Sequence, residues 1–166
     1  MTRVCLVGAD GLNLRYELLS RETAREALRT YDLDEPYDNT VAVETISLGR
    51  AVALCNDLDW YLARFARAAL VLEPSVSGTE WLSRDLATAI RDDRVDPDDT
   101  GRFLRVYGVQ SRDADAEDDG AEAADQPPRL VEPMLVARTG DTLPEYDLRA
   151  VEDTLRVRLT EAEFEE

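Results

Sequence analysis

The sequence predicts an α+β domain in which a small, mostly antiparallel sheet packs against two or three helices. Three observations lead to this prediction. Short runs of apolar or alternating residues recur along the chain, as in strands with one or both faces buried. Between these runs, apolar residues return at steps of three and four, which is the spacing of a helix face. A chain of 166 residues usually forms a single domain with a real core.

The chain begins with two predicted strands. Residues 3–8, RVCLVG, form a short apolar run, and residues 12–18, LNLRYEL, alternate between apolar and polar. Asp10-Gly11 between them is a favoured two-residue hairpin turn. The alternative is a phosphate-binding glycine loop, but a dinucleotide fingerprint would need glycine where Leu6 stands. We therefore favour the hairpin.

The middle of the chain predicts three helices and two strands. A continuous helix over 48–72 would be about 37 Å long, which leaves room for a break near Asn56-Asp57. The next helix would place Trp81 on its inner face. In chain order, the expected elements are a helix over 20–31, a strand over 40–47, helices over 48–72 and 79–92, and a strand over 102–109.

The composition changes abruptly after residue 110. Residues 111–128 hold seven acidic residues, one arginine and no large apolar side chain, so we expect a disordered acidic linker. Residues 130–138 and 153–159 are strand-like, although helical spacing also fits the second run. Pro133 lacks a backbone donor and belongs at a sheet edge or a bulge. The chain thus divides into a main part at 1–110, the linker at 111–128, and a C-terminal segment at 129–166 that docks back onto the same domain.

The charges are strongly unbalanced. The chain has 36 acidic and 19 basic residues, all of the latter arginine, and its net charge is −17. Such a chain repels itself at low ionic strength, whereas at molar salt the Debye length falls to about 3 Å. We therefore expect an acidic, halophilic protein from haloarchaea. An acidic mesophilic protein from a GC-rich genome is the alternative.

The sequence predicts a cytoplasmic location. The apolar run at the N-terminus is too short for the core of a signal peptide, and no run approaches the length of a membrane span. Cys5 and Cys55 lie among apolar neighbours. Free, buried thiols are therefore expected, rather than a disulfide or a nucleophile.

Histidine is absent, which removes the usual base of Ser-His-Asp and Cys-His sites and the commonest zinc ligand. Residues 96–107 partly match a calcium loop, but Tyr107 stands where the bidentate glutamate belongs, so we favour a capped turn. Asp32, Asp34 and Asp38 form a carboxylate cluster that a proline interrupts. We expect no metal, no cofactor and no catalytic residue.

One predicted helix face combines aromatic and basic side chains. Trp60 and Arg64 are four residues apart, so the guanidinium can lie over the indole, and Arg67 follows one turn later. These three residues are the candidate contacts for a partner, and a helix with one solvated face is the simpler interpretation. Arg156 and Arg158 share a strand face, where they either bind an anion or pair with neighbouring acidic residues.

Several stretches resemble an uncharacterised haloarchaeal protein family, a domain of unknown function. The resemblance is carried by MTRVCLVGADGLNLRYELLSRETA, NDLDWYL, WLSRDLATAI and GRFLRVYGV. It covers the first 109 residues and extends to 129–166. It implies an origin and a location, and it implies no activity or site residues.

We expect a non-catalytic interaction or regulatory module adapted to high salt. One alternative is a small carboxylate-dependent enzyme or nucleotide-binding protein that uses Asp10 and its neighbours; another is an RNA-associated accessory protein that uses the arginine-aromatic helix. The linear sequence has no net positive footprint for counterion release, so nucleic acid is a disfavoured partner, and no membrane is expected. A deep pocket that joins Asp10 with Asp57 or Asp59 would favour the enzyme. An exposed patch of the three candidate contacts would favour the module.

Overall fold

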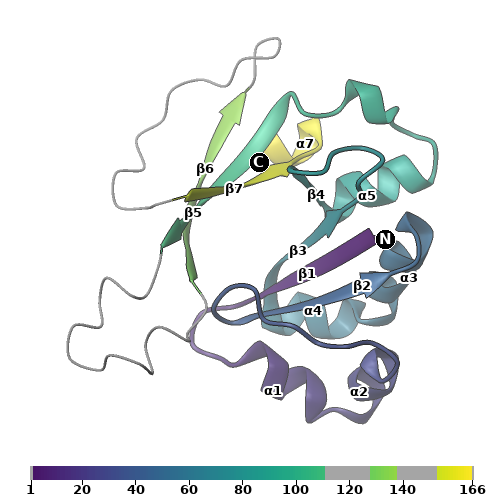
Figure 1. The fold of residues 1–166 in the computed structure, drawn as a ribbon, viewed down its shortest axis with the longest axis vertical. Helices are drawn as coiled ribbons and strands as arrows, with labels where there is room; N and C mark the ends of the chain where they lie inside the picture. The colour runs from purple at the N-terminus through teal and green to yellow at the C-terminus, as the bar shows by residue number, and fades with distance from the viewer. Residues whose placement is uncertain (1, 111–127, 138–152, 166) are drawn as a thin grey trace.

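The computed structural model describes residues 2–110, 128–137 and 153–165 (Figure 1). The predicted acidic linker at 111–128 lies outside these residues, apart from Pro128. In chain order, the elements are β1 (Thr2–Gly8), α1 (Leu14–Leu19), α2 (Glu22–Leu28), β2 (Thr40–Thr45), α3 (Leu48–Asp57), α4 (Asp59–Phe65), β3 (Ala66–Leu72), β4 (Trp81–Ser83), α5 (Arg84–Arg91), the 3-10 turn η1 (Pro97–Asp99), β5 (Phe103–Gln110), β6 (Arg129–Ala137), β7 (Asp153–Arg158) and α7 (Glu161–Glu165).

The described strands form one seven-stranded sheet in the order β2-β1-β3-β4-β7-β5-β6. All neighbouring pairs are antiparallel except β4 and β7, which run parallel. The predicted α+β class, with its mostly antiparallel sheet, is therefore confirmed. β7 lies between β4 and β5, so the C-terminal strands belong to the same sheet as the N-terminal ones.

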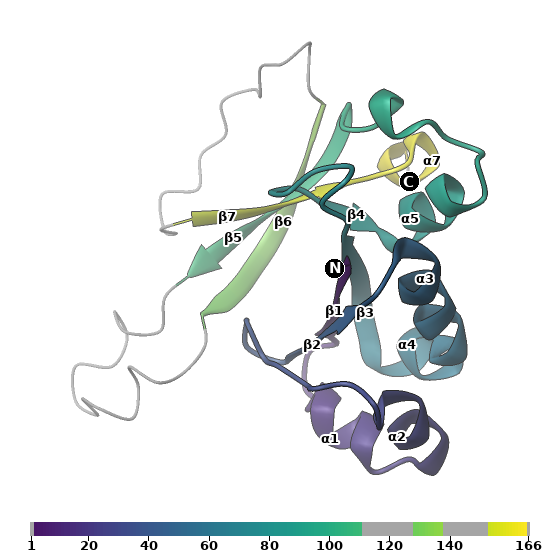
Figure 2. The same cartoon turned by 45° about the vertical axis from the view of Figure 1, so that its right-hand side comes forward.

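The helices cover one face of the first half of the sheet. Figure 2 shows α3, α4 and α5 on one side of β1 and β3, with β5, β6 and β7 turned toward the other side. The core on the helical side joins Val4, Leu6 and Val71 of the sheet to Leu54 of α3 and Leu86 of α5. Burying side chains of this size stabilises the fold by roughly 1.5–3 kcal/mol each. No helix in the described part of the chain is long and apolar enough to cross a membrane.

The sheet curls so strongly that its two ends meet. The amide of Asp38, just before β2 at one edge, donates to the carbonyl of Pro128, just before β6 at the other edge, at 2.7 Å. Side chains on the inner face of this curl form a second core, in which Val7 of β1 and Leu130 of β6 belong to the same cluster as Tyr107 of β5. This curl brings the start of β6 next to the end of β1.

The predicted hairpin at the N-terminus is wrong. Residues 14–19 form helix α1 rather than a second strand. Asn13 begins the helix, since its side chain accepts the amide hydrogen of Tyr16 at 3.0 Å. Leu14 and Leu18, four residues apart, are buried, whereas Tyr16 is 68% exposed. The run LNLRYEL is therefore compatible with both a strand and a helix, and the Asn13 cap favours the helix.

The predicted long helix over 48–72 contains a break and then a strand. α3 ends at Asp57 and α4 begins at Asp59, so the expected interruption is confirmed one residue beyond the predicted dipeptide. The last seven residues form β3, which pairs with β1. Likewise, the predicted helix over 79–92 is the short strand β4 followed by α5, with Ser83 as the N-cap. In both places, a strand with apolar residues on both faces imitates helical spacing.

The remaining predicted elements are confirmed with small shifts of their bounds: α2 for 20–31, β2 for 40–47, β5 for 102–109, β6 for 130–138, and a strand rather than a helix for 153–159. Pro133 lies on β6, the last strand in the sheet order. It also falls where the β5–β6 register shifts, between the pairs Val106–Met134 and Gly108–Val131. Because Pro133 lies at this shift, its missing amide hydrogen removes no hydrogen bond between β5 and β6.

Candidate functional site

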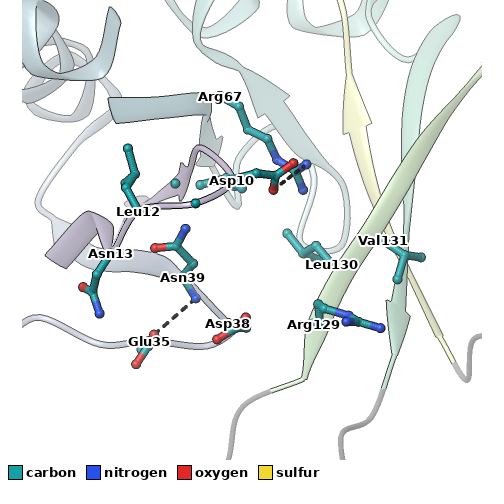
Figure 3. A pocket seen from close by; sticks show the side chains of 13 residues that line it. Asp10, Leu12, Asn13, Glu35, Asp38, Asn39, Arg67, Arg129, Leu130 and Val131 are labelled. Atoms are coloured by element: carbon teal, nitrogen blue, oxygen red, sulfur yellow. Dashed lines mark hydrogen bonds and ion pairs between the residues drawn. The ribbon is translucent and has the colours of Figure 1, made fainter. Parts of the chain in front are cut away.

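A cavity of about 610 Å³ lies where the two ends of the sheet meet (Figure 3). Its walls are the end of β1 and the loop after it, the segment before β2, Arg67 of β3 and the first residues of β6. Segments that are more than 100 residues apart in the chain, such as Asp10 and Leu130, thus face one space. A volume of this size lies in the usual range for small-molecule sites.

Asn39 fixes one wall of the cavity. Its side-chain Nδ2 donates to the carbonyl of Ala9 at 3.1 Å, and its Oδ1 accepts the amide hydrogen of Leu14 at 2.8 Å. Asn39 has a φ of 58°, in the left-handed region that asparagine tolerates better than most residues. Its backbone carbonyl accepts from the amide of Gly8 at 2.8 Å. The loop after β1 and the turn before β2 are therefore tied together.

Charges of both signs line the cavity. Asp10, Glu35 and Asp38 supply carboxylates, and Arg67 and Arg129 supply guanidinium groups. Figure 3 shows Arg67 reaching toward Asp10 on one wall and Arg129 on the opposite wall. The Arg67–Asp10 contact is 3.8 Å long, and the Asp10 side chain is 96% exposed, so this ion pair is weak.

The cavity does not bring together the three carboxylates whose shared pocket would favour the enzyme alternative. Asp10 lines it, whereas Asp57 and Asp59 lie at the junction of α3 and α4. Asp59 instead pairs with Arg84 of α5 at 2.8 Å.

Trp60 and Arg64 meet on the exposed face of α4 as predicted. The guanidinium carbon of Arg64 lies 3.8 Å from the centre of the Trp60 ring, and Trp60 is 49% exposed. Arg64 also donates to the Trp60 carbonyl through a long hydrogen bond of 3.4 Å. Within the described ranges, no carboxylate lies within 4 Å of the Arg64 guanidinium.

Arg67 does not extend the Trp60–Arg64 face. Helix α4 ends at Phe65, and Arg67 belongs to β3, where it contacts Asp10 and lies 6.0 Å from the Tyr107 ring centre. The expectation of one more helical turn failed because the chain enters the sheet at residue 66. Arg67 therefore belongs to the cavity.

The sequence did not reveal that other side chains extend the Trp60 face. The ring of Trp60 packs edge-on against those of Tyr61 and Phe65, with centroids 5.0 and 6.3 Å apart. Arg21, which precedes α2, lies 5.2 Å from the Phe65 ring centre. Two adjacent rings with an arginine at each end, in the order Arg64–Trp60–Phe65–Arg21, thus form a strip from α4 to the residue before α2. Arg21 is remote in sequence, and no local spacing points to it.

Both cysteines are free and buried, as predicted. Burial raises the pKa of the Cys5 thiol to about 12 and that of Cys55 to about 11. Because the thiolate is the nucleophile, neither cysteine is activated at neutral pH.

The other candidate motifs have structural roles. Asp96 caps η1 by accepting the amide hydrogen of Asp98 at 3.0 Å, so the favoured capped turn is confirmed. Arg156 and Arg158 pair with the buried carboxylate of Glu80, at 3.8 and 2.8 Å, rather than presenting a free cationic face. Among the described residues, no three potential metal ligands of the His, Cys, Asp or Glu type cluster together.

The fold and these sites define a small α+β protein with a curled sheet, a charged cavity at the closure of that sheet, and one exposed aromatic-arginine strip. The chain belongs to the Family of unknown function (DUF5804), whose model matches residues 2–109. Neither the curated proteins nor the solved structures contain a match to this chain. The family match ends before β6 and β7, so it leaves out part of the cavity wall.

Proposed function

We propose that this protein is a non-catalytic interaction module that binds a partner protein through Trp60 and Arg64 on α4. The observation that carries the proposal is the stacked pair itself: a large indole, 49% exposed, with a guanidinium held 3.8 Å above its ring. Tryptophan and arginine are the residues most enriched among those that dominate protein–protein binding energy. Cation–π stacking also holds both side chains before binding, which lowers the entropy lost on association.

The charges around the strip favour a protein over a nucleic acid. Arg84 pairs with Asp59 at 2.8 Å, and Arg21 lies 3.5 Å from Glu17. Arginines that already contact carboxylates release few counterions on binding phosphate, and the net charge of −17 opposes a polyanion. An aromatic centre surrounded by charges of both signs is typical of a protein interface.

Arg64 specifies the chemistry of the partner. Its guanidinium faces no carboxylate among the described residues, and its hydrogen bond to the Trp60 carbonyl is long. An arginine fork fits a carboxylate through two parallel hydrogen bonds. The partner therefore presents an acidic side chain to Arg64, beside an apolar side chain that covers the indole.

The proposed environment is a cytoplasm of high ionic strength, as in haloarchaea. The composition supports it, because 36 acidic residues and an all-arginine set of 19 basic residues suit a medium in which surface repulsion is screened.

Affinity capture in molar potassium chloride tests the binding role. The wild-type protein, Trp60→Ala, Arg64→Gln and the control Ile46→Ala are immobilised, and bound proteins and nucleic acids are identified. Ile46 is 74% exposed and lies before α3, away from the strip, so its truncation controls for loss of any exposed apolar side chain. We expect a protein that the wild type and Ile46→Ala retain and that both strip variants lose. Recovery of RNA alone, or equal capture by all four proteins, would overturn the proposal.

A further inference from the structure

The cavity at the closure of the sheet carries an inference that goes beyond the protein-binding role. We propose that it binds a small zwitterionic molecule of the amino-acid type, with an ammonium group, a carboxylate and a short apolar part. No residue of α4 lines this cavity, so it is distinct from the Trp60 strip.

The walls of the cavity are preformed. Backbone hydrogen bonds hold the loop after β1 on both sides, from Gly8 to Asn39 and from Ala9 to Phe65, each at 2.8 Å. A third bond, from Asp38 to Pro128 at 2.7 Å, ties the turn before β2 to the chain that enters β6. The side chain of Asn39 adds its two bonds described above. A ligand would therefore meet an ordered site and lose little binding energy to ordering it.

The charges on the walls fit a ligand with one charge of each sign. Three carboxylates and two guanidinium groups share the walls, and they come from different segments of the chain. A polyphosphate or nucleotide would face more carboxylates than guanidinium groups. A divalent cation needs clustered oxygen ligands, and the described residues contain no such cluster. A molecule with one charge of each sign fits both kinds of group.

The charged groups on the walls can exchange their present contacts for contacts with a ligand. The pair of Arg67 and Asp10 is loose, at 3.8 Å, and Asp10 is 96% exposed. An exposed pair of this kind contributes less than about 1 kcal/mol, so a ligand carboxylate can replace Asp10 beside Arg67 at little cost. Glu35 stands on the wall across from Arg67 (Figure 3), where its carboxylate, which also accepts the amide hydrogen of Asn39 at 3.3 Å, suits an ammonium group. Leu12 and Leu130 supply the apolar surface for the part between.

Three matched probes separate the two charges. L-leucine carries both, L-leucinamide lacks the carboxylate, and N-acetyl-L-leucine lacks the ammonium group. Binding to the full chain in molar potassium chloride is measured by ligand-observed NMR titration. We expect L-leucine to bind roughly tenfold more tightly than either analogue, because each analogue loses one charge-assisted contact. Equal binding of L-leucine and either analogue, or no detectable binding of L-leucine, overturns the proposal.

Variants then place the binding site. Arg67→Gln removes the proposed carboxylate partner and should abolish the preference for L-leucine over L-leucinamide. Arg29→Gln is the matched control, because Arg29 is exposed on the surface after α2 and contacts only Glu26, at 3.5 Å, among the charged residues described. An unchanged preference in Arg67→Gln would place binding elsewhere and overturn the assignment. Partner capture by the Trp60 strip is a separate readout, so failure here leaves that proposal intact.

Discussion

The side chain of Asn39 occupies the space that a side chain on Gly8 would need. A Cβ built on Gly8 would lie 2.6 Å from Nδ2 of Asn39 and 2.7 Å from its Cγ and Oδ1. Asn39 cannot easily give way, because its amide group is bonded on both sides, to Ala9 and to Leu14. Gly8 is thus explained by packing between β1 and the turn before β2.

Gly8→Ala should therefore destabilise the protein by about 1–3 kcal/mol, the usual cost of overpacking. Gly78→Ala is the control, because a Cβ there meets nothing within 4 Å, and it should change stability by less than about 0.5 kcal/mol. Chemical unfolding in molar potassium chloride measures both. Equal unfolding midpoints for the two variants would show that the space between Gly8 and Asn39 is not tight.

The buried carboxylate of Glu80 should be more costly to remove than an exposed one. The side chains of Glu80 and Arg158 are only 7% and 14% exposed, and Arg158 Nε donates to Glu80 at 2.8 Å. Glu80→Gln leaves a buried guanidinium without its countercharge, which should cost about 3 kcal/mol. Glu26→Gln, which breaks an exposed pair with Arg29, should cost less than about 1 kcal/mol. Similar losses of unfolding free energy in the two variants would show that burial does not make the Glu80–Arg158 pair more important than the exposed pair.

The thiols should be unreactive in the folded protein. With pKa values of about 12 for Cys5 and about 11 for Cys55, iodoacetamide at pH 8 should modify neither until the chain unfolds. The raised pKa of Cys5 also makes the free energy of unfolding depend on pH. The stabilisation from burying the neutral thiol is complete below the ordinary pKa of 9.0 and is lost as the pH rises toward 12. Mass spectrometry of the alkylated protein checks the first statement, and unfolding at several alkaline pH values checks the second. Rapid alkylation without unfolding would contradict the burial.

Glu73 should make the fold sensitive to acid. Burial opposes ionisation of its carboxyl group, but hydrogen bonds from Thr2 and Ser75 outweigh burial and hold its pKa below the ordinary value of 4.5. Its contribution to stability is present above pH 4.5 and is lost as the pH falls through the lowered pKa. Thr2→Val removes the side-chain donor and should flatten the dependence of stability on pH in this acid range. An identical slope in the wild type and Thr2→Val would argue against this linkage.

Salt should be required for a tight fold. When potassium chloride falls from molar to about 0.1 M, the Debye length grows to about 10 Å and the repulsion among 36 acidic residues returns. Circular dichroism should then report loosened structure. A spectrum that is unchanged in low salt would count against the halophilic interpretation.

The sequence predicts the elements well where the periodicity is unambiguous. The run TVAVET and the alternating DTLRVR are strands, β2 and β7, as expected. Errors occur where two patterns coincide. Leu14 and Leu18 fit both a strand face and a helix turn, and only the Asn13 cap distinguishes them. The apolar run of β3 continues the helical spacing of α4, so nothing local marks the change at residue 66.

Of the two candidate sites, one follows from local spacing in the sequence and the other does not. The stack of Trp60 and Arg64 follows from helical spacing, so the sequence predicts it. The cavity does not follow from any local pattern, because it depends on the curl that brings Asp38 to Pro128. Arg67 illustrates the difference. The sequence indicates it as a candidate contact, but the residues that it contacts depend on where helix α4 ends.

The position of β7 between β4 and β5 has a consequence for biosynthesis. Until residues 153–158 leave the ribosome, β4 and β5 have no common neighbour, and each keeps an open row of backbone donors and acceptors. The N-terminal half can pack its helices early, but the sheet closes only late in translation. A nascent chain from which β5 and β6 have emerged but β7 has not therefore exposes these two strand edges to chaperones and to other nascent chains.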